Sequence, residues 1–380
     1  MQNLVSYIQE NKNIDFNKKA FNELDAAIFA RLSYINFEKV VKNGRYFAKK
    51  PIGKIFKTLI KDSKIDLRFK YHEDRTLLEE LASSKRFKDI YVYSYEEDKN
   101  IDLTKQFAAV TFLNKEKGNK FIVLSFRGTD GTYTGWKEDF EMCYKPVIPA
   151  QKEAESYAKK VLRFSPIKKV YFVGHSKGGN LAIYASTFIK PSKIDAIYCY
   201  DSPGFNKLFL NSRAYKNIMP KIKHFVPQTS IIGRLMNSDY ESIIVDSNKT
   251  LLYQHNIYNW NVEKDEFKRL DKFTFISNKL KKILDQSLEK MNNEQKQEFV
   301  ESLFNVIKEM TDNDIIQFGD SFLSFALRFR KAFKMQNDET KKLIYSIFTS
   351  PNDDEKEVKY IEPIHNKKSV LDKIKDKLNK

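Results

Sequence analysis

The segment VYFVGHSKGGNLAIYAS, residues 170–186, decides the fold class because it joins a strand signal, a tight turn and a helix signal. Its first part is β-branched and aromatic, as in a buried strand, whereas LAIYAS is apolar at helical spacing. Between them, Gly174 to Gly178 match the pattern Gly-x-Ser-x-Gly, in which glycines remove Cβ atoms that would collide at a sharp strand-to-helix turn. Such a turn pushes the hydroxyl of Ser176 outward. We interpret Ser176 as a candidate nucleophile, and the alternative is an ordinary structural turn.

Composition describes a folded protein with a strong positive charge. The 380 residues are 41% hydrophobic and include 30 Phe and 20 Tyr, which is enough for a sizeable core. The net charge of +17 attracts anionic substrates or surfaces, so both simple solubility and contact with an anionic membrane stay open. The lysines are scattered and no reader motif is present, so a nucleic-acid partner is not expected.

Cysteine usage and the first residues point to a cytoplasmic protein. Only Cys143 and Cys199 occur, without metal-ligand spacing around them, so we expect no disulfide framework, no metal and no cofactor. The start MQNLVSYIQENKN lacks the pattern of an export signal, and no window is apolar over the roughly 18 residues that a spanning helix needs. We expect a cytoplasmic location that allows peripheral membrane contact.

The chain divides into zones of different pattern. Residues 1–95 are predicted to be a helical segment packed on the core, 96–265 an α/β core, 266–350 a helical extension and 351–380 a basic tail. In the core, strand and helix signals alternate, which is typical of a mainly parallel sheet. The predicted strands are QFAAVTFLN, KFIVLSFRG, KVYFVGH, AIYCYD, KIKHFVP and SIIVDS.

A serine nucleophile needs a base, and elimination among the histidines favours His255. It follows the last predicted strand, where the serine, acid, histidine order of α/β-hydrolases places the base. The other four are poorly placed: His72 before the sheet, His175 inside the turn, His224 within a strand and His365 in the tail. The alternative for His255 is a core histidine with its hydrogen bonds satisfied.

The acid that orients the base is left open by the sequence. Asp201 ends the strand after the nucleophile helix, at the carboxyl edge of the sheet where active sites of such folds collect. Asp239 and Asp246 lie nearer the strand that precedes His255. Each could instead be a turn-capping aspartate, and an arrangement without a strong acid also remains open.

Two backbone donors are needed for an oxyanion, and loss of one typically costs about a hundred- to a thousandfold in rate. The turn supplies the N–H of Lys177, and the loop after KFIVLSFRG supplies Thr129 as the second candidate. Arg127 is expected to tie this loop to a carboxylate such as Asp139 or Glu138.

Taken together, SFRGTD, GWKEDF, GHSKGGNLA and a histidine after the last strand resemble the class 3 lipases, α/β-hydrolases related to fungal triacylglycerol lipases. The chain is more closely similar to the bacterial Mbeg-like branch, through FNELDAAIFARLSY, YDSPGF, VPQTSIIG and QHNIYNW. This resemblance covers residues from about 21 to about 307. It implies an α/β-hydrolase fold with a mainly parallel central sheet, a helical N-terminal segment and a helical C-terminal extension.

The resemblance also implies roles for single residues: Ser176 as nucleophile, His255 as base and Thr129 as oxyanion donor. In fungal class 3 lipases the aspartate follows the strand that here reads KIKHFVPQTS, and no Asp stands at the matching place. This departure favours Asp201. The segment GTYTGWKEDF occupies the place of the lipase lid, with Gly131 and Gly135 as candidate hinges.

The expected function is that of a serine hydrolase that cleaves carboxylic esters, with lipid or lysolipid acyl esters as substrates, through a Ser-His-Asp acyl-enzyme mechanism. A thioesterase or acyltransferase could use the same residues. The alternative from a different class is a non-catalytic scaffold that binds partner proteins.

Overall fold

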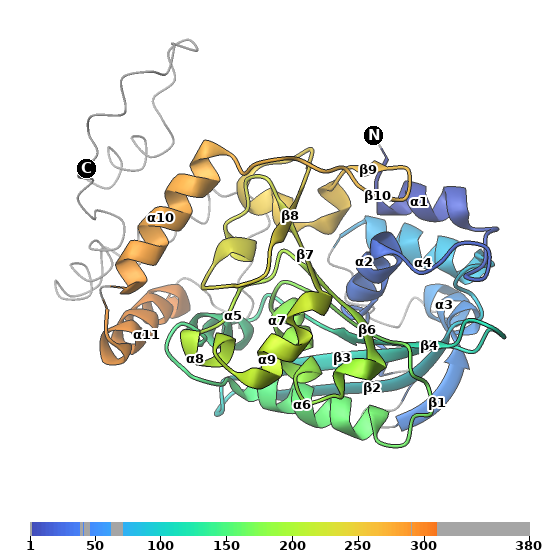
Figure 1. Ribbon diagram of the computed structural model, residues 1–380, viewed down its shortest axis with the longest axis horizontal. Coiled ribbons are helices and arrows are strands. Elements are labelled where there is room, and N and C mark those ends of the chain that lie inside the picture. Colours follow the sequence, from blue (N-terminus) through green and yellow to red (C-terminus); the bar gives the residue numbers. More distant parts are fainter. Residues whose placement is uncertain (1, 39–40, 42–45, 62–70, 290, 310–380) are drawn as a thin grey trace, which may run out of the picture. The chain divides into compact units, whose positions relative to one another are not determined.

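The main structural element is an eight-stranded sheet whose strands lie in the order in which they occur in the chain (Figure 1). The computed structural model gives the bounds β1 Tyr46–Pro51, β2 Tyr91–Asn100, β3 Lys105–Asn114, β4 Phe121–Phe126, β5 Val170–His175, β6 Ile194–Tyr200, β7 Ile222–Pro227 and β8 Ser242–Val245. Pairing is antiparallel from β1 to β4 and parallel from β4 to β8. A short hairpin, β9 Val262–Glu263 and β10 Glu266–Phe267, follows the sheet.

The fold class predicted from the sequence is confirmed. All six predicted strands are present as β3 to β8, and the segment 170–186 forms β5 followed by α7, Lys177–Ser186. The expectation that residues 1–95 are helical is wrong for β1 and for half of β2. The outer half of β2, EEDKN, is charged and only partly buried, which hides the alternation by which a strand is recognised.

Helices cover both faces of the sheet, which gives the three layers of an α/β-hydrolase fold (Figure 1). Val123 and Tyr171 point to one face and pack with α1, α2, α3 and α4, whereas their neighbours Leu124 and Phe172 point to the other and pack with α6, α7 and α9. The helix bounds are α1 Leu4–Asn11, α2 Glu23–Leu32, α3 Ile52–Lys61, α4 Glu73–Ser83, α5 Tyr133–Glu141, α6 Pro149–Leu162, α8 Lys207–Leu210 and α9 Arg213–Ile218.

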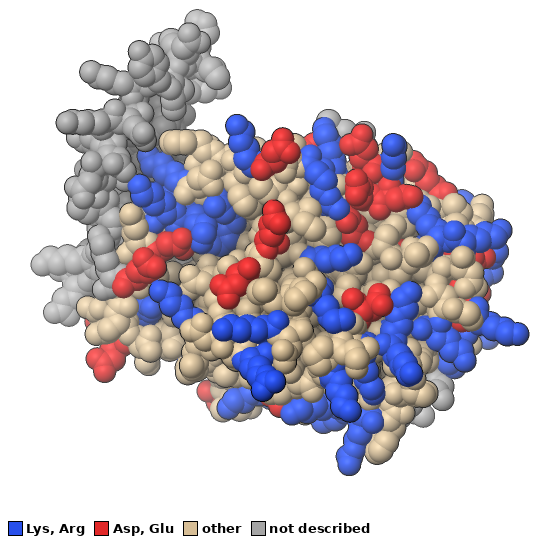
Figure 2. Space-filling model, in the orientation of Figure 1, with Lys and Arg blue, Asp and Glu red and all other residues tan. Residues whose placement is uncertain are grey.

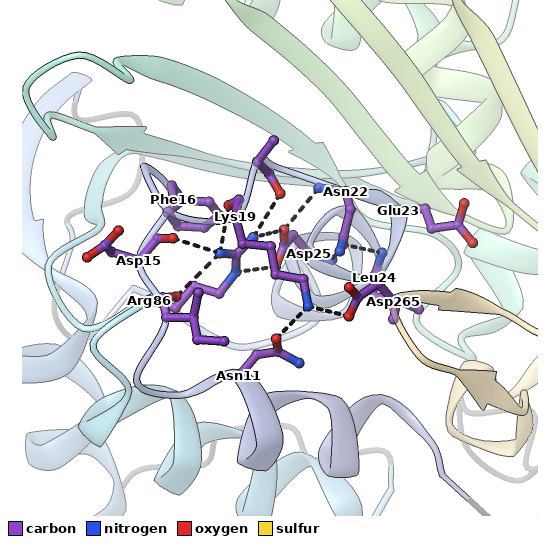
Figure 3. Close-up of polar contacts among 12 residues, drawn as sticks. Asn11, Asp15, Phe16, Lys19, Asn22, Glu23, Leu24, Asp25, Arg86 and Asp265 are labelled. Carbon is purple, nitrogen blue, oxygen red and sulfur yellow. Dashed lines mark hydrogen bonds and ion pairs between the residues drawn. The ribbon is translucent and has the colours of Figure 1, made fainter.

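A buried arginine joins the N-terminal helices to one another (Figure 3). The guanidinium of Arg86 donates to both carboxylate oxygens of Asp25, at 2.8 and 2.5 Å, and to the carbonyl oxygens of Lys19 and Ala20, at 3.0 and 3.1 Å. Neither charged side chain is exposed, so these contacts replace the water that both ions lose on burial. The pair fixes α2 against the segment after α4, and Phe29 of α2 packs on the sheet.

The structure describes residues 2–38, 41, 46–61, 71–289 and 291–309. The chain forms two compact units, Met1–Asp285 and Gln286–Lys380. Helix α10, Phe275–Glu289, begins in the first unit, and α11, Asn293–Glu309, lies in the second, where it buries Phe299, Val300 and Phe304. The predicted basic tail, 351–380, lies outside the described residues. Within the described ranges, no helix combines the length and the apolar character that a membrane span requires.

Candidate active site

Ser176 lies at the turn between β5 and α7 with φ 57° and ψ −137°, a strained conformation for a residue with a Cβ. Sterics explain the glycines beside it. A Cβ on Gly174 would lie 2.1 Å from the Gly178 carbonyl oxygen, and one on Gly178 would lie 2.1 Å from the Phe126 carbonyl oxygen. The turn is also tied to β6, because the Ser176 N–H donates to the Tyr200 carbonyl at 2.9 Å.

The structure brings His255 and Asp201 into direct contact. Nδ1 of His255 lies 2.7 Å from Oδ2 of Asp201, and the two side chains are only 14% and 2% exposed. A carboxylate can only accept at this contact, so Nδ1 carries the proton and Nε2 is left as the basic nitrogen. This is the arrangement that prepares an imidazole to take a proton from a hydroxyl.

Asp201 is itself held in place by donors from another loop. Its Oδ1 accepts the hydroxyl of Ser230 and the backbone N–H of Gly233, the latter at 3.0 Å. Asp201 has φ 47°, so the backbone at the end of β6 is strained as well. With one carboxylate oxygen occupied by these donors, the other is fixed in the direction of the imidazole.

The two other candidate acids do not contact His255 in the part of the chain that the structure describes. Asp246 accepts the side-chain amide of Asn261 at 3.0 Å and pairs with Lys268 at 3.3 Å. Asp239 is an exposed residue. Geometry therefore favours Asp201 among the three aspartates that the sequence leaves open.

His175, the residue before Ser176, links the turn to the His255 loop. Its Nε2 lies 2.7 Å from the carbonyl oxygen of His255, and the two rings are 4.4 Å apart between centroids. Its Nδ1 lies 3.1 Å from the hydroxyl of Tyr34, which belongs to the N-terminal segment. The Ser176 hydroxyl makes no hydrogen bond to His255 among the described residues. Hydrogen bonds between nucleophile and base are often long before substrate binds.

None of the remaining histidines that the structure describes forms a hydrogen bond to Ser176 or Asp201, although His224 lies close enough to Asp201 for the carboxylate to affect its pKa. His224 in β7 is buried, its Nε2 lies 3.0 Å from the Ser202 carbonyl, and burial lowers its pKa to about 4. The side chain of His72 is 92% exposed beside Glu73. His365 lies outside the described residues.

The loop after β4 packs directly on the turn that carries Ser176. A Cβ on Gly128 would lie 3.0 Å from the Ser176 Cβ, so backbone at this place must approach closely. The next residue, Thr129, is 5% exposed, and its backbone N–H has no acceptor among the described residues. Lys177 occupies the first position of α7, where a backbone N–H has no partner within the helix. The backbone N–H groups of Thr129 and Lys177 thus lie near the turn, and each could donate to a bound group without first breaking a hydrogen bond.

The side chain of Lys177 enters a buried ionic cluster that the sequence did not reveal. Its Nζ lies 2.8 Å from Oε2 of Glu138 and 3.4 Å from Oδ1 of Asp139, and neither Lys177 nor Glu138 is exposed. Burial alone would lower the pKa of Lys177, but the two carboxylates outweigh it and raise that pKa. Burial raises the pKa of Asp139 to about 6, although Lys177 and the Thr129 hydroxyl, which donates to Asp139, oppose the shift. The cluster therefore ties both the loop that carries Thr129 and the turn that carries Ser176 to α5.

The expected partner of Arg127 is wrong. Its Nη2 pairs with Glu97 of β2 at 2.9 Å and lies 3.9 Å from Asp130. The carboxylates of Glu138 and Asp139 are instead taken by Lys177. The neighbouring strand β2 was not predicted, so its acidic residue could not be considered.

The segment GTYTGWKEDF, expected at the place of a lid, forms most of α5. Gly131 precedes the helix with φ 89°, a backbone conformation that favours glycine. Gly135 lies inside the helix, where an added Cβ would be 2.9 Å from Cγ2 of Thr129. Gly135 is thus a packing position against the Thr129 loop, and not a hinge.

A buried network from the N-terminal helices supports the loop that carries His255. Tyr258 donates from its hydroxyl to Oδ1 of Asp74 at 2.9 Å, and Arg31 binds both oxygens of Asp74 at 2.6 and 2.7 Å. Within the loop, Gln254 accepts the Thr229 N–H at 2.8 Å. These contacts could not be predicted from local sequence patterns, because the residues that form them are far apart in the chain.

The described residues contain no group of three or more His, Cys, Asp or Glu that could hold a metal ion. No disulfide joins the two cysteines, of which Cys199 is buried and Cys143 partly buried.

Comparison with known proteins gives a family and distant structural neighbours. The M37 lipase structure is 15% identical, with a TM-score of 0.36 over 63% of this chain and 78% of that one. The native Rhizomucor miehei lipase propeptide complex is 15% identical, with a TM-score of 0.32 over 55% of this chain and 74% of that one. No curated protein matches the chain significantly. The family model described as Mbeg1-like matches residues 81–305, a range that includes Ser176, Asp201 and His255. The chain belongs to the Mbeg1-like family.

Proposed function

We propose that the protein is a serine hydrolase that cleaves carboxylic esters through an acyl-enzyme. The observation that carries the proposal is the buried contact of 2.7 Å between His255 Nδ1 and Asp201 Oδ2, beside a serine in a strained strand-to-helix turn. A structural turn does not need an oriented imidazole next to it. The motif resemblance to class 3 lipases supports the same activity.

In the proposed reaction, Oγ of Ser176 attacks the ester carbonyl carbon while its proton passes to Nε2 of His255. The N–H groups of Thr129 and Lys177 donate to the oxyanion of the tetrahedral intermediate. The bond to the leaving alcohol then breaks, and the alcohol takes the proton from His255. Water repeats the sequence on the acyl-enzyme, which releases the acid and restores the serine.

Apolar surface beside the site supports lipid or lysolipid acyl esters as substrates. Tyr253, two residues before His255, is 55% exposed. Phe275 and Ile276 are 71% and 54% exposed, and the adjacent Ser277 donates to the Ser230 carbonyl at 2.6 Å. Exposed apolar side chains near a site suit a substrate with an acyl chain. We place this activity in the cytoplasm, because two cysteines that form no disulfide with each other suit a reducing compartment.

A fluorophosphonate probe tests the proposal, since it reacts with activated serines. We expect wild-type protein to be labelled and Ser176→Ala not to be, whereas the control Ser156→Ala on α6 keeps full labelling. A series of p-nitrophenyl esters of increasing chain length then measures the preferred acyl chain. Folded wild-type protein that neither reacts with the probe nor hydrolyses any ester would refute the proposal.

Acyl transfer is distinguished by adding an alcohol or thiol acceptor to the ester assay. A hydrolase releases the free acid whether or not the acceptor is present. A transferase forms the new ester or thioester in preference to the acid. The ratio of the two products therefore separates the activities that use the same residues.

A further inference from the structure

The amino ends of the parallel strands carry a row of lysines. Lys120, Lys169, Lys193 and Lys221 each stand directly before a strand, β4, β5, β6 and β7 respectively. These strands are neighbours and run in the same direction, so their first residues lie along one edge of the sheet, spaced by roughly 5 Å per strand. The row is a product of topology, because the four positions are far apart in the sequence.

The segments around this row strengthen its charge. They read KEKGNK, RFSPIKK, FIKPSK and KNIMPKIK, and Glu116 is their single acidic residue. Lys120, Lys168, Lys190 and Lys193 form no ion pair within the described ranges, and the first three are exposed. On the lower right of Figure 2, near the end of α6 in Figure 1, Lys and Arg outnumber Asp and Glu.

An apolar hollow lies within the same edge. It measures about 720 Å³ and lies between the end of α6 and the end of α7, where Leu162, Phe188 and Ile189 line it together with cations. Phe164 at its rim is 77% exposed and Phe188 is 40% exposed. Of the lysines that line the hollow, Lys159 and Lys160 pair with Glu155 and Glu96, whereas Lys190 and Lys193 form no ion pair within the described ranges. Exposed aromatic rings beside such lysines are typical of surfaces that lie at a lipid interface, where rings enter the headgroup region and cations meet anionic headgroups.

We propose that this amino edge docks the protein on an anionic lipid bilayer. A bilayer fits better than a nucleic acid, because acyl chains can contact the aliphatic Leu162 and Ile189 as well as the exposed phenylalanine rings of the hollow, whereas bases would stack on the rings alone. Ser176 and Asp201 follow the carboxyl ends of β5 and β6, at the opposite edge of the sheet. The docking surface is therefore separate from the proposed active site.

Vesicle flotation of the full chain tests the proposal, with phosphatidylglycerol mixed equally with phosphatidylcholine against phosphatidylcholine alone. Each lysine near an anionic leaflet strengthens binding by about fivefold, so the four unpaired lysines predict a preference on the order of several hundredfold that weakens at high salt. The Lys190→Glu and Lys193→Glu double variant should lose at least about 25-fold. The control is Lys207→Glu with Lys272→Glu, which makes the same charge change on exposed lysines at the carboxyl edge.

Two further variants test membrane binding in ways that depend neither on loss of folding nor on catalysis. Phe164→Trp should shift its emission to the blue and be quenched by brominated lipid when anionic vesicles are added. Ser176→Ala should bind as wild type does, so failure of the proposed hydrolase would not affect this test. Equal binding to both vesicles, equal loss in the control variant, or binding of an oligonucleotide through Lys190 and Lys193 without vesicle binding would each overturn the proposal.

Discussion

The buried ammonium of Lys177 makes a sharp prediction about stability. Lys177→Met leaves the Glu138 carboxylate buried with two backbone donors among the described residues, the N–H groups of Gln106 and Ala150 at 3.1 and 2.8 Å. Removing one partner of a buried pair costs about 3–5 kcal/mol, because the other charge stays desolvated and uncompensated. An exposed Lys152→Met, by contrast, should change stability by no more than about 0.5 kcal/mol.

Urea unfolding followed by tryptophan fluorescence measures this loss. Trp136 and Trp260 both belong to the unit 1–285, so the signal reports on the unit that contains the cluster. Adding Glu138→Gln to Lys177→Met removes the orphaned charge and should restore most of the lost stability. A loss below about 1 kcal/mol for Lys177→Met, or a double variant no more stable than the single one, would refute the account of the cluster.

Three further predictions concern the site and its surroundings. Asp201→Asn should lower kcat for hydrolysis of a p-nitrophenyl ester by roughly a thousand- to ten-thousandfold, because an amide does not hold the required tautomer of His255. An unchanged kcat would exclude Asp201 as the acid. Burial raises the pKa of Asp139 to about 6, so between pH 4 and pH 6 its carboxyl group keeps a proton in the native state that the unfolded chain releases. Wild type should therefore lose stability relative to Asp139→Asn as the pH rises from 4 to 6. Urea midpoints that change in parallel for the two proteins over this pH range would contradict the prediction. Gly178→Ala should strongly reduce thermal stability, since its Cβ would meet the Phe126 carbonyl at 2.1 Å, and a melting temperature equal to wild type would show that the turn can relax.

Short-range patterns were enough to predict the central part of the fold. The strands β3 to β8 are apolar runs bounded by turn residues, and the glycines around Ser176 are needed because an added Cβ would lie 2.1 Å from a neighbouring carbonyl oxygen. The charged outer half of β2 carried no such signal. The sequence also reduced the candidate acids to three aspartates, since each lies near the end of a strand.

Local pattern by itself therefore determined the fold class, the turn at Ser176 and the candidates around it, because periodicity and glycine sterics act between residues close in the chain. Only the tertiary structure decided that Asp201 meets His255, that Lys177 pairs with Glu138 and that Arg127 pairs with Glu97. These contacts join residues 30 to 54 positions apart, and which carboxylate reaches which cation depends on how strands and helices pack. The row of lysines at the amino edge has the same origin, because parallel pairing brings together four residues that no local pattern connects.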